Sequence, residues 1–237
     1  MRNPFFQFKQ FTIHQQNTSM KVTTDACLFG AWVAKKLHDL DYKTALDIGT
    51  GTGLLSLMIA QKNNIEMDAV EIDHLAAEEA KENIEGSTFH KNVQLIEGDI
   101  LEFIPANKYD VILSNPPFYE NDLMAETQAR NKAFHSSHLT LTQLLQTIKK
   151  VLAADGRFFL LLPFRRKDEA IEIIKENGFE INEVVHVHHS PIHPPTRIML
   201  MCGYKKEFNA SDIYIRENDS TYSKAFTELL KDYYLYL

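Results

Sequence analysis

The chain is poor in the features that define several protein classes. Its only cysteines are Cys27 and Cys202, which lie far apart and in no paired spacing, so we expect reduced thiols in a cytosol rather than a disulfide framework. No apolar run approaches the length of a membrane span, and the N-terminus lacks the apolar core of a signal peptide. Internal repeats, low-complexity tracts and linkers are also missing. These absences predict a cytoplasmic globular protein with no membrane partner.

The chain also lacks an excess of lysine and arginine over acidic residues. The net charge of −7 argues against a bulk nucleic-acid binder, although a local basic patch matters more than the total. A hydrophobic content of 44% with 15 phenylalanines supplies an ample core, and 237 residues suit one α/β domain. We therefore expect a single domain over residues 1–237, with an N-terminal extension over about residues 1–40 and a C-terminal strand and helix over about 208–237. We expect a monomer.

From Thr44 onward, strand and helix patterns alternate along the chain. The predicted elements are residues 44–48, 54–63, 67–72, 74–86, 93–97, 109–114, 139–153, 156–163, 167–177, 180–188 and 196–204. This alternation predicts a Rossmann-like α/β fold, with a mainly parallel seven-stranded sheet and helices on both faces. Ligands of such a fold bind outside the carboxyl ends of the strands.

The two ends of the chain show weaker patterns. Residues 5–15 alternate loosely, as an edge strand or hairpin does, and residues 23–37 are typical of a helix. Residues 212–216 are a possible further strand. Five aromatic or aliphatic residues then repeat at helical spacing, which is typical of core packing: Tyr222, Phe226, Leu229, Tyr233 and Leu237.

A glycine-rich turn follows the strand predicted at residues 44–48. It reads Asp47-x-Gly49-x-Gly51-x-Gly53, and a helical pattern starts at Leu54. Glycines let the backbone pass close to a ligand. The nicotinamide fingerprint Gly-x-Gly-x-x-Gly does not fit, because the third glycine arrives one residue early. Asp47 at the strand end repels a diphosphate and attracts a cation, so the motif favours S-adenosylmethionine over NAD.

Acidic residues also follow the next two predicted strands. Glu71 lies about twenty residues after the glycine turn, where an acidic residue commonly accepts the ribose hydroxyls of a cofactor. Asp99, followed by Ile100, is placed to accept the amino group of an adenine. Each could instead be an ordinary helix N-cap. Three acidic residues at successive strand ends predict a cofactor site.

The strand predicted at residues 109–114 ends in Asn115-Pro116-Pro117-Phe118. The two prolines stop the strand and fix the turn. The Asn115 side-chain oxygen and the Pro116 carbonyl can each accept one N–H of an amino group, while Phe118 stacks on the ring that carries it. A polar turn is the plain alternative. Residues 120–137, polar and without a period, are either a loop that closes over substrate or an ordinary connection.

Two further segments leave alternatives open. Residues 20–25 form a polar turn before the first predicted helix, where Thr24 and Asp25 are either an N-cap or ligand contacts. Four histidines crowd residues 186–193, but prolines mark a loop there and we see no neighbouring carboxylate or thiol, so we expect no metal site.

Together these segments resemble a known family. Residues 8–11, 20–25, 30–32, 46–55 and 114–118 are similar to those of the bacterial tRNA(Val) adenine-N6 methyltransferases, and the match extends through Tyr222-Ser223 and the aromatic C-terminus. The resemblance implies N6 methylation of adenosine 37, beside the anticodon, with S-adenosylmethionine converted to S-adenosylhomocysteine. It places in the cofactor pocket Lys21, Thr24, Asp47, Gly49, Gly51, Gly53, Glu71, Asp99, Ile100 and Asn115, and in the catalytic turn Asn115, Pro116, Pro117 and Phe118.

A tRNA partner requires phosphate contacts despite the acidic total. The candidates are Lys9, Lys21, Lys149, Lys150, Arg165, Arg166, Lys167 and Arg197, although exposed lysines and arginines are more often only solvated. Other substrates remain open: a glutamine amide of a protein, or adenine in DNA or ribosomal RNA. A non-catalytic RNA-binding protein with a residual cofactor pocket is a further alternative, which the intact acidic and glycine positions disfavour.

Overall fold

The structure is a computed structural model that describes residues 3–18, 20–38, 40–116 and 139–237. Pro117, Phe118 and the segment 120–137 lie outside the described residues. The elements in chain order are β1 (Phe5–Gln7), β2 (Thr12–His14), α1 (Thr24–Leu37), β3 (Thr44–Ile48), α2 (Leu54–Ala60), β4 (Glu66–Glu71), α3 (His74–Glu85), β5 (Val93–Glu97), β6 (Tyr109–Ser114), α4 (Leu141–Val151), β7 (Leu152–Pro163), the 3₁₀ turn η1 (Phe164–Arg166), α5 (Lys167–Glu176), β8 (Glu180–His188), β9 (Pro195–Gly203), β10 (Asn209–Tyr214) and α6 (Lys224–Leu230).

The described strands form one large mixed sheet and a small hairpin. The sheet order is β10-β8-β9-β7-β6-β3-β4-β5, and β1 pairs with β2. Only β9 runs antiparallel to its neighbours among these eight strands, so the prediction of a mainly parallel sheet is confirmed. The count of seven is wrong. Strand β10 adds an eighth edge position parallel to β8, and its single buried residue, Ile213, explains its weak sequence signal.

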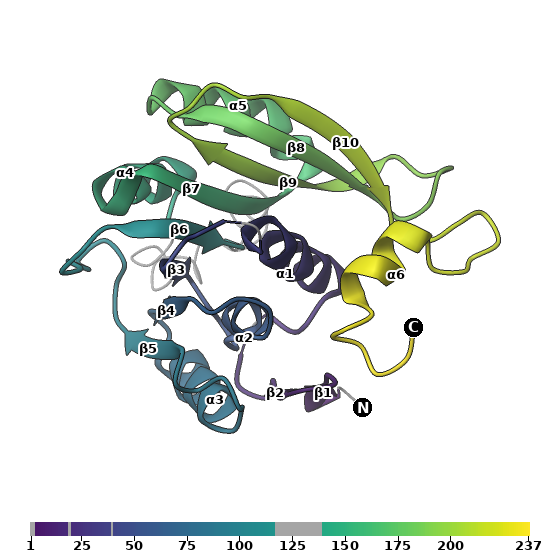
Figure 1. The fold of residues 1–237 in the computed structure, drawn as a ribbon, viewed down its shortest axis with the longest axis horizontal. Helices are drawn as coiled ribbons and strands as arrows, with labels where there is room; N and C mark the ends of the chain where they lie inside the picture. The colour runs from purple at the N-terminus through teal and green to yellow at the C-terminus, as the bar shows by residue number, and fades with distance from the viewer. Residues whose placement is uncertain (1–2, 19, 39, 117–138) are drawn as a thin grey trace, which may run out of the picture.

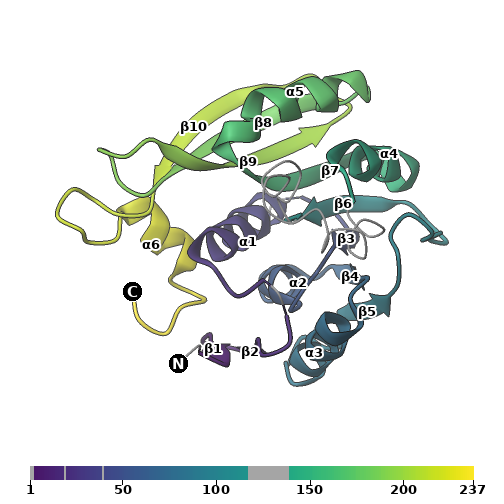
Figure 2. The same cartoon turned by 180° about the vertical axis from the view of Figure 1, so that it is seen from behind.

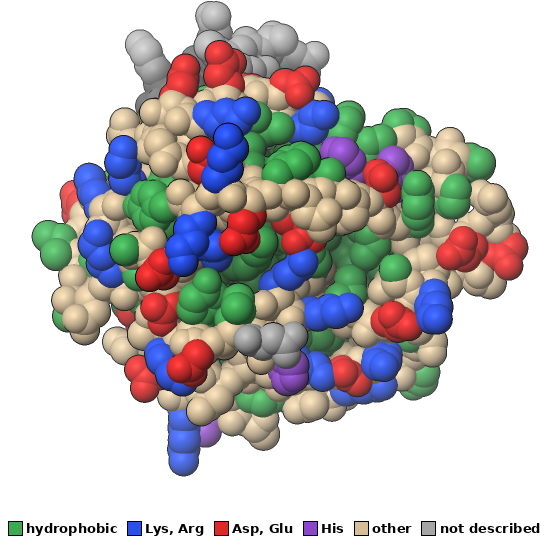
Figure 3. Space-filling model, turned by 45° about the horizontal axis from the view of Figure 1, so that its top comes forward, with side chains coloured by type: hydrophobic (Ala, Val, Ile, Leu, Met, Phe, Trp, Pro, Cys, Tyr) green, Lys and Arg blue, Asp and Glu red, His purple; other side chains and the backbone are tan. Residues whose placement is uncertain are grey.

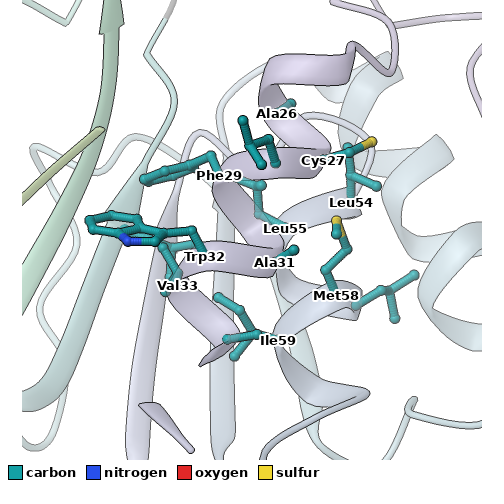
Figure 4. Packing of buried hydrophobic residues seen from close by; sticks show 14 of the residues in the cluster. Ala26, Cys27, Phe29, Ala31, Trp32, Val33, Leu54, Leu55, Met58 and Ile59 are labelled. Carbon is teal, nitrogen blue, oxygen red and sulfur yellow. The ribbon is translucent and has the colours of Figure 1, made fainter. Parts of the chain in front are cut away.

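Helices cover both faces of the sheet (Figures 1 and 2). One apolar cluster joins the sheet to α1, α2, α6 and the β1–β2 hairpin, and the other joins it to α4 and α5. Helices α1 and α2 pack closely, with Leu55 and Met58 of α2 turned toward α1 (Figure 4). Gly30 permits this approach, since a Cβ there would lie 2.9 Å from Met58 Sδ.

The N- and C-terminal segments meet beside this pair of helices. Lys9 N donates to Tyr233 O at 2.8 Å, and the Tyr233 hydroxyl donates to Met58 O at 2.9 Å. Phe226, Leu230 and Tyr233 are buried in the same cluster as α1. This packing supports a single domain over residues 1–237, which stays a prediction. No helix among the described residues is long and apolar enough to cross a membrane.

Most predicted elements are present, with ends that local side chains explain. Helix α2 ends at Ala60 rather than at residue 63, and beyond this end the Asn63 side-chain NH2 group donates to Ile59 O and Ala34 O. Helix α4 starts with a capping box, in which Thr140 and Gln143 bond each other's backbone N–H. The capping box places the start of α4 at the carboxyl edge of the sheet, where Gln143 lines the cavity described below.

Candidate active site

A cavity of about 340 Å³ opens where strands β3, β4, β5 and β6 end. Loops after these four parallel strands supply most of its wall, as expected for ligand sites in this kind of fold. The sequence-predicted residues that line it are Lys21, Gly49, Gly51, Glu71, Asp99, Ile100, Asn115 and Pro116. Three others, Thr24, Asp47 and Gly53, are not part of the wall that the described residues form.

The glycine turn owes its shape to three left-handed residues. Gly49, Gly51 and Gly53 have φ values of 70°, 59° and 79°, which other residues adopt only with strain. A Cβ on Gly49 or Gly51 would meet no atom within 4 Å, so the turn faces open space there. Gly53 instead faces helix α3, since a Cβ would lie 3.4 Å from Ile84. The first two glycines therefore border the cavity, and the third packs against protein.

Asp47 lies beneath the turn rather than in the cavity. It is fully buried, and its Oδ2 accepts hydrogen bonds from Thr50 Oγ1 at 2.7 Å and Ser56 Oγ at 2.8 Å. Its Oδ1 is buried and has no partner among the described residues. Burial raises the pKa of this carboxyl to about 6, although the two hydroxyls lower it; the Glu71 charge adds a smaller increase. Asp47 therefore fixes the turn through the hydroxyls of Thr50 and Ser56, while its Oδ1 receives no hydrogen bond from the described residues.

Glu71 connects the glycine turn to the end of β4. Its Oε2 accepts from Gly51 N at 2.8 Å, and its Oε1 accepts from the N–H groups of Ile72 and Asp73, both at 3.0 Å. A carboxylate oxygen can accept two hydrogen bonds. Oε1 is therefore saturated, while Oε2 retains one acceptor position for a hydroxyl in the cavity.

Asp99 and Ile100 follow β5 on the same edge. Asp99 Oδ1 accepts from Leu101 N at 2.8 Å, which fixes the carboxylate, and Ile100 is buried beside it. Both line the cavity. An apolar surface next to a fixed carboxylate suits a flat ring with an amino group.

Asn115 and Pro116 close the cavity at the end of β6. The Asn115 Oδ1 atom is buried and has no hydrogen-bond partner among the described residues, while Nδ2 lies 3.6 Å from Met20 Sδ. An unpaired buried carbonyl oxygen is costly and marks a position built for a donor. Pro117 and Phe118 lie outside the described residues, so the predicted stacking by Phe118 stays a prediction.

The N-terminal segment contributes more of the wall than the sequence indicated. Thr18, Met20 and Val22 line the cavity together with the predicted Lys21. Thr24, the first residue of α1, is not part of this wall. The capping residue is Thr23, whose hydroxyl accepts from Ala26 N. Gln143 also lines the cavity and was not predicted from the sequence. The pattern that could have indicated it is the capping box Thr140-x-x-Gln143, which starts α4 beside the cavity.

The basic candidates are spread over several places. Lys21 lines the cavity, while Lys149 and Lys150 lie in the last turn of α4, where Lys149 Nζ donates to Asn177 O at 2.9 Å. Arg165, Arg166, Lys167 and Arg197 lie around η1 and the start of β9, where Pro163 pairs with Arg197. Arg197 Nε pairs with Asp25 at 2.9 Å, and Arg166 pairs with Glu169 at 3.0 Å. Lys9 lies elsewhere, with its Nζ donating to Lys231 O. On the face seen in Figure 3, basic and acidic side chains are interspersed rather than gathered in one stripe.

The histidine segment differs from the sequence interpretation. A carboxylate does lie beside it, because β10 places Asp212 3.3 Å from His186 and 3.0 Å from His188. The His188 hydrogen bond is the main cause that lowers the pKa of Asp212. The pairing of β10 with β8, invisible in the local sequence, brings them together. No group of three or more potential ligands arranged to hold a metal occurs among the described residues.

Comparison with known proteins decides the family. The family model described as the methyltransferase small domain matches residues 30–177. A tRNA1(Val) (adenine(37)-N6)-methyltransferase of Dyadobacter fermentans is 39% identical over 240 residues, which cover 99% of this chain and 98% of the relative. The chain belongs to this methyltransferase family.

Other relatives agree with this membership. A protein of the same name from Vibrio vulnificus is 35% identical, with 97% of this chain and 95% of the relative covered. Among solved structures, a predicted O-methyltransferase of Agrobacterium tumefaciens superposes with a TM-score of 0.66 at 17% identity, covering 88% of this chain and 96% of that one. The latter likeness shows the fold alone. The predictions of a Rossmann-like methyltransferase and of S-adenosylmethionine as its methyl donor are confirmed.

The cavity residues fit this donor. Glu71 Oε2 has an acceptor position for a ribose hydroxyl, and Asp99 with Ile100 suits an adenine. Asp47 Oδ1, which has no partner among the described residues, leaves negative charge beneath the glycine turn, next to where a cationic methionine portion belongs. These residues would hold the donor with its methyl group toward Asn115.

Proposed function

We propose that the protein methylates N6 of adenosine 37 in tRNA1(Val), using S-adenosylmethionine. The observation that carries the proposal is the buried Asn115 Oδ1, an acceptor that lines the cofactor cavity and has no partner among the described residues. An exocyclic amino group supplies the donor that this atom lacks. The relatives named for this reaction support the choice of adenosine 37 and of a valine tRNA.

Asn115 and Pro116 would orient the amino nitrogen. The lone pair of an adenine amino group is delocalised into the ring, which makes it a poor nucleophile. If the Asn115 oxygen and the Pro116 carbonyl each accept one N–H, the nitrogen is held with its lone pair toward the methyl donor. Holding reacting atoms about 3–3.5 Å apart and in line is a large share of the rate enhancement.

The step balances without a strong base. Bound S-adenosylmethionine supplies an electrophilic methyl group. A bond forms between N6 and the methyl carbon, the bond from that carbon to sulfur breaks, and its electron pair goes to sulfur. The nitrogen becomes cationic and then releases one proton to water. The chain's own residues need only orient the amine, bind the cofactor and exclude competing water.

The target base must leave its stack to reach Asn115. Unstacking is cheapest in a single-stranded loop, so an anticodon loop is a suitable substrate. We propose that the RNA phosphates bind near η1 and β9, where Arg165, Arg166, Lys167 and Arg197 lie at the edge of the sheet that bears the cavity. We further propose a monomer that works in the cytosol, consistent with two buried free cysteines.

A substrate panel tests the proposal. The purified protein is incubated with isotopically labelled S-adenosylmethionine and, at one salt concentration, with unmodified tRNA1(Val), its isolated anticodon stem-loop, duplex DNA or a glutamine peptide. We expect label in N6-methyladenosine from the intact tRNA and little in the other substrates. Preferential labelling of the peptide or the DNA would overturn the tRNA assignment and leave the amine chemistry of Asn115 standing.

A further inference from the structure

The segment before α1 lies outside the range of the family model yet forms part of the active-site wall. The model matches residues 30–177, whereas Thr18, Met20 and Val22 line the cavity. Residues this far from the glycine turn in sequence need a tertiary anchor to hold them over it. The structure contains such an anchor on helix α3.

Glu79 of α3 is the main anchor. It is 3% exposed, and its two carboxylate oxygens accept hydrogen bonds from the backbone N–H groups of Gln16, Asn17 and Thr18. Three consecutive N–H groups that point at one carboxylate fix both the position and the direction of the segment. Charge-assisted bonds of this kind are stronger than neutral ones.

Asn83, one helical turn later on α3, adds a second attachment. Its side chain bonds His14 in both directions, accepting from His14 N at 2.8 Å and donating to His14 O at 2.9 Å. The same amide also donates to Thr52 O in the glycine turn at 3.0 Å. Helix α3 therefore holds the N-terminal segment and the glycine turn in one fixed relation.

The segment then reaches the amine-binding residue through Met20. Asn115 Nδ2 lies 3.6 Å from Met20 Sδ, which makes the thioether its weak acceptor. Oδ1 is then the atom of the carboxamide that has no partner in the part of the chain that the structure describes. If the carboxamide were rotated by 180°, the NH2 group would face the substrate amine and no N–H could be accepted. The Met20 contact therefore favours the orientation in which Oδ1 can accept an N–H of the substrate.

We propose that Glu79 is a positioning residue for Asn115, acting through the N-terminal segment and Met20. This inference rests on the proposed function, because it assigns to Asn115 the amine of the substrate. Glu79 touches neither substrate nor cofactor. Its effect is to hold Met20 where the thioether keeps the Asn115 oxygen turned toward the amine.

Two variants test the proposal at opposite ends of this series of contacts. Glu79→Gln replaces one acceptor oxygen with an NH2 group that opposes a backbone N–H, and Met20→Leu removes the sulfur while preserving the volume. The matched control is Glu82→Gln, the same change at an exposed position of α3. Met20→Gln, which restores an acceptor of similar reach, is the rescue variant.

We expect Glu79→Gln and Met20→Leu each to lower kcat about 10-fold, with S-adenosylmethionine affinity changed less than about threefold, because only the alignment of the amine is disturbed. Their double variant should also lose about 10-fold rather than 100-fold, because both act on the same contact. The side-chain amide resonance of Asn115 should shift in both single variants. Glu82→Gln should match the parent, and Met20→Gln should recover most of kcat.

Other outcomes overturn the inference. Equal kcat in Glu79→Gln and Glu82→Gln, additive losses in the double variant, or an unshifted Asn115 resonance would each show that Glu79 only anchors the segment. If Glu79→Gln does not fold, Met20→Leu decides alone, since Met20 is 36% exposed. The resonance measurement uses no RNA, so it tests the role of Glu79 separately from the tRNA assignment. The tRNA assignment is contradicted if the parent protein forms no N6-methyladenosine.

Discussion

Gly51 N donates a 2.8 Å hydrogen bond to Glu71 Oε2, which links the glycine turn after β3 to the end of β4. The other oxygen of Glu71 accepts from the N–H groups of Ile72 and Asp73. Glu71 is 8% exposed, so these bonds form in a site of low water access. One carboxylate therefore shapes two loops of the cavity and still offers an acceptor to a ligand.

Loss of the Glu71 carboxylate should weaken cofactor binding. We expect Glu71→Ala to raise the Kd for S-adenosylmethionine by a factor equivalent to ~1–3 kcal/mol, because buried hydroxyl donors lose their acceptor. Titration calorimetry on the purified protein measures it. Glu66→Ala, an exposed change at the other end of β4, is the control and should match the parent. Unchanged affinity in Glu71→Ala contradicts the assignment.

Asp47 should make the free protein less stable as pH rises. Burial raises the pKa of its carboxyl from 3.8 to about 6, so folding favours the protonated form. The contribution to stability is complete below pH 3.8 and is lost as pH rises through about 6. A pKa displacement of this size corresponds to a change of ~3 kcal/mol in the free energy of unfolding.

The variant Asp47→Asn removes that pH dependence. Its Tm at pH 8 should exceed that of the parent by several degrees, and the difference should shrink toward pH 4. Scanning calorimetry without ligand at several pH values measures both. The same variant should bind S-adenosylmethionine more weakly, because the negative charge beneath the turn is gone. A lower Tm at pH 8 in the variant would refute this account of Asp47.

RNA binding should depend on the basic residues around η1 and β9. We expect Lys167→Ala and Arg197→Ala each to weaken tRNA binding and to reduce the slope of log Kd against log salt by about one unit per lost phosphate contact. The control is Lys62→Ala, since Lys62 pairs with Asp232 beyond the far end of α2. Fluorescence anisotropy at several salt concentrations gives the slopes. Equal slopes of log Kd against log salt in all three variants would argue that the residues around η1 and β9 do not contact RNA phosphates.

The central strands β3 and β6 were the most predictable part of the fold, because they are buried on both faces. Residues 44–48, 93–97, 109–114 and 180–188 are strands with the predicted ends. Continuous apolar runs closed by glycine, acidic or proline residues give such segments clear limits. The edge strand β10 was predicted at residues 212–216 rather than 209–214, because a solvated edge carries little apolar pattern.

The site was predictable only where the sequence itself places residues at strand ends. Glu71, Asp99 and Asn115 follow their strands directly, so the parallel sheet brings them together. Met20 and Glu79 were not predictable, because their contacts join segments about sixty residues or more apart through backbone hydrogen bonds and a side-chain rotamer. The sequence predicted the correct turn for Asp47 but expected its side chain to face the cofactor. In the structure the side chain lies beneath the turn, because the buried hydroxyls of Thr50 and Ser56 donate to it there.

The central claim is that the Asn115 carboxamide orients an adenine amine for methylation. The most direct measurement compares the parent protein and Asn115→Ala on tRNA1(Val), with nuclease mapping and mass spectrometry of the anticodon fragment and with cofactor affinity measured in parallel. We predict N6-methyladenosine at position 37 for the parent, and for the variant a kcat lower by ~10²–10³, as for the loss of an oriented oxyanion-hole group, with nearly unchanged cofactor affinity. Near-normal turnover in Asn115→Ala, or methylation at another atom by the parent, would contradict the account.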